Sequence, residues 1–355
     1  MPTMEITTAI ACRVLCEFCP QELLIKEYST LNNKNNINYG SPEIMSFEVF
    51  KTCLNKIPKS VTISFSGYTE PFLNPNCSQM ILYAFNMGYS VQVFSTLVGL
   101  TIEDIDILET ISFDVFHVHL PDKEMFAKIA VNEKYLNVVK KLVSSKIKNV
   151  TGMTMGTLHP KIKNILKSDI VADSMGDRAG NLKNMDTKYS RKIGPLVCNR
   201  ASKTSLIDKL DENVLLPNGD VALCCNDYGL KNILGNLHNS DYLSLFNSET
   251  FENIYNKMKS DDKEIICRNC PESITEKEFN ERVDFFNKDY SNDSIALSLI
   301  ELYANLLGRF PDKTGFTYFY TKISNNEITI FDIENQIKKS PEFISIHPST
   351  LSLNS

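Results

Sequence analysis

Three cysteines near the start of the chain, Cys12, Cys16 and Cys19, constrain its fold and chemistry more than any other feature. They stand in the run C-R-V-L-C-E-F-C, with three residues between the first two and two residues between the last two. Thiolates at this spacing can curl around one face of an iron–sulfur cubane and bind three of its irons. Because protein clusters are normally held by four cysteine thiolates, three leave one iron with an open coordination position. Such a position is typical of a reactive metal site rather than a structural one.

A zinc knuckle is the alternative for the same three cysteines. Structural zinc sites use four closed ligands, and the neighbouring sequence offers no further cysteine or histidine. Cys53 and His117 are far along the chain, although folding can bring either of them close. The spacing therefore favours a cluster over zinc.

The bulk composition predicts two or three globular domains. The chain has 355 residues, of which 43% are hydrophobic and 23% charged, as in ordinary soluble proteins. Its net charge of −6 argues against nucleic acid as a partner, because phosphate binding needs a basic face. No apolar run reaches the ~18 residues of a membrane span, and the first residues do not form a signal peptide pattern. We therefore expect a cytoplasmic protein with no membrane partner.

The use of cysteine points to metal binding. Ten cysteines in a chain with no export signal indicate metal ligands rather than disulfides. Cys53 and Cys77 stand alone within apolar helical patterns, so we expect both to be small buried side chains. Five of the others lie in the second half of the chain: Cys198, Cys224, Cys225, Cys267 and Cys270.

Strands and helices are predicted to alternate from residue 5 to about residue 180. Short runs rich in β-branched and aromatic residues predict strands at 6–10, 61–66, 91–96, 113–120, 150–155 and 170–173. Apolar residues at helical spacing predict intervening helices at 47–54 behind Ser46, at 80–85, at 105–108 behind Thr101 and, longest, at 123–146. This alternation implies an α/β fold with a parallel sheet. Periodicity alone does not separate a barrel from a doubly wound sheet.

Polar motifs follow four of the predicted strands. In βα folds the chemistry gathers in the loops at the carboxyl ends of the strands. The cysteine run follows the first strand, and the others are Ser66-Gly67-Tyr68-Thr69-Glu70-Pro71 after the second, Ser95-Thr96 at the end of the third, and Asp177-Arg178-Ala179-Gly180-Asn181 after the sixth.

These motifs, in this order, resemble those of the radical S-adenosylmethionine (radical SAM) superfamily. The C-x₃-C-x₂-C run has the family's aromatic residue before its last cysteine, and G-x-x-E-P is a longer variant of the family's G-G-E-P. Tyr68-Thr69 departs from that pattern by replacing a plain second glycine. The resemblance implies a partial (β/α)₆ radical SAM barrel over residues 1–190, in which SAM binds the open iron through its amino and carboxylate groups. It also implies cofactor contacts with the glycine, the carboxylate that faces the ammonium, the ribose-side hydroxyl and the carboxylate-binding guanidinium: Gly67, Glu70, Thr96 and Arg178.

The second set of cysteines forms another recognisable pattern over residues 191–275. The turn signal N-G-D predicts a hairpin between 215–216 and 221–225. The segment resembles the small α+β SPASM/twitch extensions of radical SAM enzymes, in which a Gly-x₄-Cys, here Gly219 to Cys224, helps to hold an auxiliary [4Fe–4S] cluster. A single four-cysteine set fits the shorter twitch type, with these metal ligands: Cys198, Cys224, Cys267 and Cys270. A Cys₄ zinc ribbon is the competing interpretation, Cys225 can replace Cys224, and Asp227 is expected to be a turn residue.

The sequence of the C-terminal region predicts a helix and linker at 276–292, followed by a small all-α module at 293–348. Gly308 is expected to end one helix, and Pro311-Asp312 to begin the next. The module resembles a helical domain of unknown function that is often attached to glycosyltransferases and bacterial surface proteins. A protein partner that docks through this module is one expectation, and a spectator bundle is the other.

The resemblance implies an enzyme that reductively cleaves SAM to methionine and a 5′-deoxyadenosyl radical, which then abstracts hydrogen from a substrate. An electron donor such as flavodoxin or ferredoxin and oxidoreductase-type chemistry on a small, sugar-like alcohol are expected. The alternatives are a peptide-modifying maturase and a non-enzymatic zinc or iron–sulfur scaffold. His117 and His119 alternate on the fourth strand and so share a face, where they either contact substrate or pack.

Overall fold

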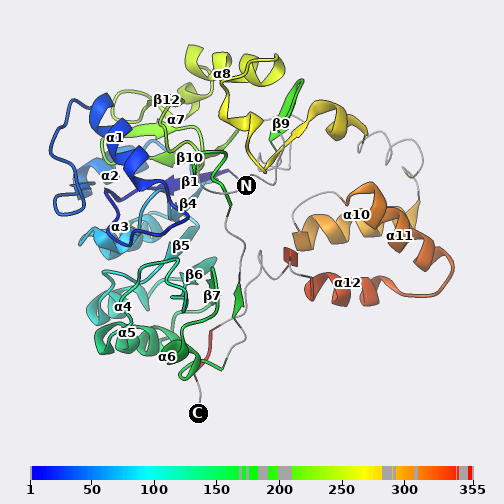
Figure 1. Ribbon diagram of the computed structural model, residues 1–355, viewed down its shortest axis with the longest axis horizontal. Coiled ribbons are helices and arrows are strands. Elements are labelled where there is room, and N and C mark those ends of the chain that lie inside the picture. Colours follow the sequence, from blue (N-terminus) through cyan, green and yellow to red (C-terminus); the bar gives the residue numbers. More distant parts are fainter. Residues whose placement is uncertain are drawn as a thin grey trace.

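A computed structural model describes residues 2–167, 170–172, 176–182, 191–198, 210–281, 290, 293–307, 311–340, 342–343 and 351–353. Its main sheet has the strand order β12-β11-β10-β1-β4-β5-β6-β7-β8 (Figure 1). Six neighbouring strands run parallel: β1 (Thr3–Ile6), β4 (Thr62–Phe65), β5 (Val91–Ser95), β6 (Val115–His119), β7 (Val150–Thr154) and β8 (Val171–Ala172). The predicted parallel α/β sheet is therefore confirmed, with its six strands in sequence order.

Helices between these strands cover one face of the sheet (Figure 1). They are α2 (Phe47–Leu54), α3 (Cys77–Asn86), α4 (Ile102–Leu108), α5 (Glu133–Ser144) and α6 (Pro160–Lys163). Two helices begin at the predicted caps, because Ser46 accepts a hydrogen bond from the Val49 amide and Thr101 forms a capping box with Asp104. Cys53 and Cys77 are fully buried in α2 and α3, as expected.

Two elements differ from the prediction. The first strand begins at Thr3 and ends at Ile6, and the chain then bends, so that β2 (Ala9–Ile10) pairs with β3 (Glu43–Ile44) instead. The predicted helix at 123–146 is shorter, because α5 begins only after the cap at Asn132. In the segment before it, the carboxylate of Asp122 accepts the backbone amides of Phe126 and Ala127 and so replaces helical hydrogen bonds.

The cysteine-rich region extends the same sheet. β10 (Glu212–Leu215) lies parallel to β1, and β11 (Asp220–Ala222) and β12 (Ile233–Asn236) continue it in antiparallel fashion. The predicted hairpin is confirmed by the pairs Val214–Ala222 and Leu215–Val221. Outside the sheet, β9 (Leu196–Cys198) pairs with β13 (Ser273–Thr275), next to α7 (Tyr242–Leu245), α8 (Glu249–Lys259) and the 3₁₀ turn η2 (Ile266–Arg268).

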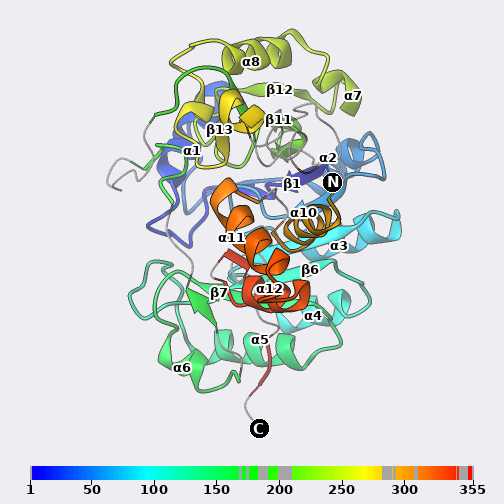
Figure 2. The ribbon, with the colours of Figure 1, turned by 90° about the vertical axis from the view of Figure 1, so that its right-hand side faces the viewer.

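Three C-terminal helices form a separate bundle with its own apolar core. They are α10 (Ser294–Leu307), α11 (Lys313–Ser324) and α12 (Ile330–Lys338), and Leu299, Phe316 and Ile333 are buried at their centre. Asp312 caps α11 by accepting the Gly315 amide, as the sequence predicted. Figures 1 and 2 place this bundle on the side of the sheet opposite α2–α5. Among the described residues, no helix is long and apolar enough to cross a bilayer.

After the bundle, the chain returns to the parallel sheet. The Leu351 amide donates to the Val150 carbonyl at 2.8 Å, and the Lys167 amide donates to the Ser352 carbonyl at 2.8 Å. Leu351 is only 5% exposed, and a Cβ on Gly152 would lie 2.6 Å from its Cδ2 atom. Residues 351–353 thus belong to the core of the N-terminal domain.

Candidate functional site

The three N-terminal cysteines lie in a tight loop between β2 and α1 (Gln21–Leu31). Ala11 and Leu15, which directly precede Cys12 and Cys16, have φ angles of 78° and 56°. Non-glycine residues rarely adopt this conformation, and where they do the surrounding structure must hold them. Charge interactions among Cys12, Cys16 and Cys19 contribute to the raised pKa values of the first two thiols. The Cys19 amide donates to the Cys16 carbonyl at 3.1 Å, so the loop turns back on itself between these two cysteines.

Gln21, the first residue of α1, holds this loop together and was not predicted from the sequence. Its side chain is buried, and its Oε1 accepts the Cys12 amide at 3.0 Å. Its Nε2 donates to the Cys19 sulfur at 3.3 Å and to the Tyr68 carbonyl at 2.5 Å. A glutamine directly after C-x-F-C-P, at the start of a helix, was the available signal.

The chemistry of these thiols fits an iron–sulfur cluster. Burial raises the pKa of Cys12 to about 12, and burial beside Cys19 and Cys12 also raises the pKa of Cys16. Burial and the like charges of neighbouring thiolates disfavour the ionised forms of Cys12 and Cys16, which become favoured when bound cations neutralise them. Three thiolates leave one iron of a cubane without a protein ligand.

Gly67 brings the loop after β4 against the first strand. Its φ is +62°, and a Cβ there would lie 2.3 Å from Thr7 Oγ1 and 3.0 Å from the Thr7 amide nitrogen. The Gly67 amide donates to Glu5 Oε2 at 3.1 Å, and the Tyr68 amide donates to Thr7 Oγ1 at 3.1 Å. Only glycine combines this φ with this contact.

Glu70 forms a clamp between this loop and the end of β5. Its Oε1 accepts Ser95 Oγ at 2.7 Å and the Phe72 amide at 3.2 Å, and its Oε2 accepts the Thr96 amide and hydroxyl, both at 2.6 Å. A carboxylate has about four lone-pair sites, so the chain itself occupies them. Burial nevertheless raises the pKa of Glu70. The predicted contacts of Glu70 and Thr96 with SAM remain predictions, and their observed role is to join two strand ends.

Arg178 lies between the two cysteine regions. Its Nε donates to the Phe18 carbonyl at 3.4 Å, and interaction with Tyr228, Cys225 and Cys19 raises its pKa. The neighbouring Asn181 side chain donates to the carbonyls of Arg178 and Asn226 at 2.8 and 2.7 Å. The R-A-G-N segment therefore packs against both cysteine loops.

Three buried polar groups at the carboxyl edge of the sheet have no hydrogen-bond partner in the described part of the chain. They are Nε2 of His119 on β6, Oγ1 of Thr154 on β7 and both carboxylate oxygens of Asp177 after β8. Buried polar groups in folded proteins are normally bonded. The carboxyl ends of three successive strands thus offer polar groups to a ligand, at the edge where βα folds bind substrate.

The two histidines on β6 share a face, as predicted, but differ in their surroundings. His117 Nδ1 lies 2.9 Å from Thr151 Oγ1, whereas the His119 ring stacks on Phe18 with centroids 5.3 Å apart. Phe18 is the aromatic residue before the last cysteine of the loop. His117 is therefore held by the sheet, and His119 faces the cysteine loop with a free ring nitrogen.

Burial of His117 predicts a pH-dependent stability. Burial, with the nearby His119, lowers the pKa of His117 from 6.5 to about 4. Below pH 6.5 the unfolded chain binds a proton that the folded chain does not, so stability present above that pH is lost as the pH falls towards about 4. We expect the free energy of unfolding of the parent to fall by about 2 kcal/mol between pH 6.5 and about pH 5 through this group, and we expect His117→Asn to lack this fall. Urea unfolding at both pH values measures this free energy, and His238→Gln, which changes an exposed histidine, is the control. A His117→Asn variant with the same pH dependence as the parent would contradict the prediction.

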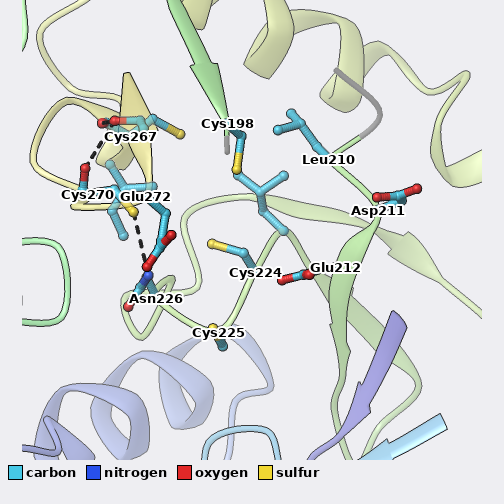
Figure 3. Close-up of a pocket in the computed structure, with 13 residues that line it drawn as sticks. Cys198, Leu210, Asp211, Glu212, Cys224, Cys225, Asn226, Cys267, Cys270 and Glu272 are labelled. Atoms are coloured by element: carbon cyan, nitrogen blue, oxygen red, sulfur yellow. Dashed lines mark hydrogen bonds between the residues drawn. The ribbon is translucent and has the colours of Figure 1, made fainter. Parts of the chain in front are cut away.

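The second set of cysteines lines one pocket (Figure 3). Cys198 lies on β9, Cys224 follows β11, and Cys267 and Cys270 lie in and after η2. The side chain of Asn226 donates to the Cys270 sulfur at 3.6 Å. As placed, no three Cys, His, Asp or Glu side chains of the described residues meet closely enough to bind a single metal ion. The four thiols surround a space rather than a point.

Cys224 and Cys225 both line this pocket but pack against different apolar clusters. Cys224 packs against the same apolar cluster as Cys198 and Cys267, whereas Cys225 packs with Cys19 against the cluster that contains Tyr228. This geometry favours Cys224 as the fourth member of the set. Asp227 accepts the amides of Lys231 and Asn232 and so closes a turn, as predicted.

Arg268, which lies between Cys267 and Cys270, was also not predicted from the sequence. It is 2% exposed, and its guanidinium donates to the backbone carbonyls of Asp262, Lys192, Gly194 and Ser260. These bonds hold the segment before β9 against the loop before η2. Because Cys198 lies on β9 and Cys267 lies in η2, the same bonds fix the position of Cys198 relative to Cys267 and Cys270.

The family SPASM, described as an iron–sulfur cluster-binding domain, matches residues 210–271. This part of the chain is similar to a SPASM domain. The matched residues include the hairpin β10–β11 and four of the five cysteines that line the pocket: Cys224, Cys225, Cys267 and Cys270. The match favours an iron–sulfur domain over a zinc ribbon. No curated protein sequence matches the chain.

Solved structures agree with this fold. BtrN in complex with AdoMet and 2-DOIA matches with a TM-score of 0.52 and 16% identity, over 76% of this chain and 93% of that one. The native anSMEcpe with bound AdoMet matches with a TM-score of 0.45 and 13% identity, over 76% and 86%. SuiB of Streptococcus suis bound to precursor peptide SuiA matches with a TM-score of 0.41 and 10% identity, over 71% and 66%. The likeness to BtrN shows a shared fold, and the predicted α/β fold class with a parallel sheet is confirmed.

Proposed function

We propose that this protein is a radical SAM enzyme with two [4Fe–4S] clusters. The observation that carries the proposal is the placement of the C-x₃-C-x₂-C loop. It joins the Gly67 loop through the Gln21 side chain, and unpartnered polar groups stand at the neighbouring strand ends. Cys12, Cys16 and Cys19 hold the reactive cluster in this proposal.

SAM is proposed to bind over the same edge of the sheet. When bound, the cluster and SAM supply a 5′-deoxyadenosyl radical that abstracts hydrogen from a substrate. The chain contributes the glycine at 67, which lets the backbone approach the ligand, and the clamp of Glu70 with Thr96, which fixes the loop. Arg178 offers a guanidinium, which suits a carboxylate, and burial of Cys12 and Phe18 keeps water away.

The auxiliary cluster is proposed to be held by Cys198, Cys224, Cys267 and Cys270. Four thiolates close a cluster fully, which suits an electron acceptor rather than a substrate-binding iron. We therefore propose net oxidation of a small, sugar-like alcohol, with a flavodoxin or ferredoxin as the external electron donor. The likeness in fold to BtrN, whose structure contains AdoMet and 2-DOIA, supports a small-molecule substrate. The orphan carboxylate of Asp177 offers such a ligand an acceptor.

The test is the iron and sulfide content of anaerobically reconstituted protein, followed by incubation with SAM and dithionite. We expect about eight irons in the parent and about four in the Cys12→Ala/Cys16→Ala/Cys19→Ala variant, with 5′-deoxyadenosine formed by the parent alone. Cys53→Ala, which changes a buried cysteine of α2, is the matched control and should keep both properties. Zinc in place of iron in the parent would contradict the proposal.

A further inference from the structure

Two buried tyrosines cross between the cysteine loops of the two domains. Tyr68 comes from the loop after β4, and Tyr228 comes from the loop after β11; they are 2% and 4% exposed. Their ring centroids lie 4.7 Å apart. In the sequence, Tyr68 stands where the radical SAM pattern has its second glycine.

Each tyrosine reaches the cysteine loop of the other domain. The Tyr68 hydroxyl donates to the carbonyl of Cys224 at 2.8 Å and to that of Asp227 at 3.2 Å. The Tyr228 hydroxyl lies 3.5 Å from the sulfur of Cys19. Tyr68 therefore fixes the SPASM loop from the N-terminal domain, and Tyr228 brings a hydroxyl from that loop to an N-terminal thiol.

The direction of the Tyr228–Cys19 bond follows from the chemistry of the pair. A thiolate that binds iron has no hydrogen to donate, so the tyrosine O–H must be the donor. Gln21 Nε2 is a second donor to the same sulfur at 3.3 Å.

We infer that the SPASM domain tunes the reduction potential of the N-terminal cluster through the hydrogen bond from Tyr228 to Cys19. This inference rests on the proposed function. Reduction adds negative charge to the cluster and its sulfurs, so a donor at a ligand sulfur stabilises the reduced form more than the oxidised form. Tyr228 is a positioning residue in this sense, because it acts through Cys19.

The experiment measures the reduction potential of the cluster whose EPR spectrum changes on addition of SAM. In Tyr228→Phe we expect the ratio of reduced to oxidised cluster at a fixed potential to fall about tenfold, equivalent to about 59 mV for one electron. Tyr68→Phe, which frees the SPASM loop but keeps the Tyr228 hydroxyl, should shift the ratio in the same direction by less. Tyr242→Phe, which removes another buried hydroxyl that has no partner among the described residues, is the matched control and should leave the ratio unchanged.

The outcomes separate this inference from the proposed function. An unchanged ratio in Tyr228→Phe with full iron content would overturn the tuning role and leave the radical SAM assignment intact. Loss of the SAM-responsive iron in that variant would also overturn it, because Tyr228 would then serve only to build the loop. Absence of a SAM-responsive cluster from the parent would remove the proposed function and the inference together.

Discussion

Replacing Gly67 with alanine is expected to lower the rate of 5′-deoxyadenosine formation by about 100-fold, the effect of displacing a binding loop by about 1 Å. A Cβ at this position meets Thr7 Oγ1 at 2.3 Å and Thr7 Cα at 3.1 Å. Because two of the three nearest atoms belong to the backbone of the chain after β1, a side-chain rotation cannot relieve the contact. The loop must move away from Thr7, and the Glu70 clamp moves with it.

Gly88→Ala provides the matched control for this prediction. Gly88 has a φ of +84° and no atom within 4 Å of an added Cβ. The control therefore carries the backbone strain of alanine at positive φ, about 1–2 kcal/mol, without the steric contact. The rate is measured with dithionite and saturating SAM on protein of equal iron content. Equal rates for the parent and Gly67→Ala would show that the loop does not need this close approach.

Replacing Arg268 with methionine is expected to empty the auxiliary site while leaving the N-terminal one filled. The change removes a buried donor group from four backbone carbonyls. Each carbonyl left without a partner costs about 1–3 kcal/mol. The segment before β9 is then free to separate from the loop before η2, so that Cys198 no longer faces Cys267. Iron should fall from about eight to about four atoms per chain, with the SAM-responsive EPR signal retained.

Arg191→Met is the control for Arg268→Met. Arg191 is exposed and donates to the carbonyl of Lys263, so it joins nearly the same two segments from the outside. The control should keep all of its iron. If Arg268→Met also keeps about eight irons, Arg268 is not what holds the four cysteines together.

The order of strands and the position of the polar motifs could be predicted because both depend on local patterns. Short β-branched runs mark β4 to β7, and two of the motifs, Gly67 to Glu70 and Ser95-Thr96, lie at the carboxyl ends of β4 and β5. Caps at Ser46 and Thr101 were equally local, since their hydroxyls bond amides three residues away. The SPASM hairpin followed from N-G-D in the same way.

The contacts that join distant segments could not be predicted. Gln21, Tyr68, Tyr228 and Arg268 act on residues that only the fold brings near, as when the Tyr68 hydroxyl reaches a carbonyl 156 positions along the chain. Nothing in the local sequence of Tyr68, Tyr228 or Arg268 distinguishes them from ordinary surface or core residues. The start of the helix predicted at 123–146 was wrong for a related reason. The carboxylate of Asp122 accepts hydrogen bonds from the amides of Phe126 and Ala127, so the helix begins later.

The return of residues 351–353 to the parallel sheet makes the helical bundle an insertion rather than an appendage. The chain enters the bundle from the rest of the protein and afterwards returns to the N-terminal sheet, so the bundle lies within a closed loop of the chain. The entropy cost of closing such a loop grows only slowly with its length. Truncation at residue 290 would remove the buried Leu351, which packs against Gly152. The role of the bundle is better tested by deleting the bundle internally and joining the chain again before Leu351, because this deletion keeps residues 351–353 on the N-terminal sheet.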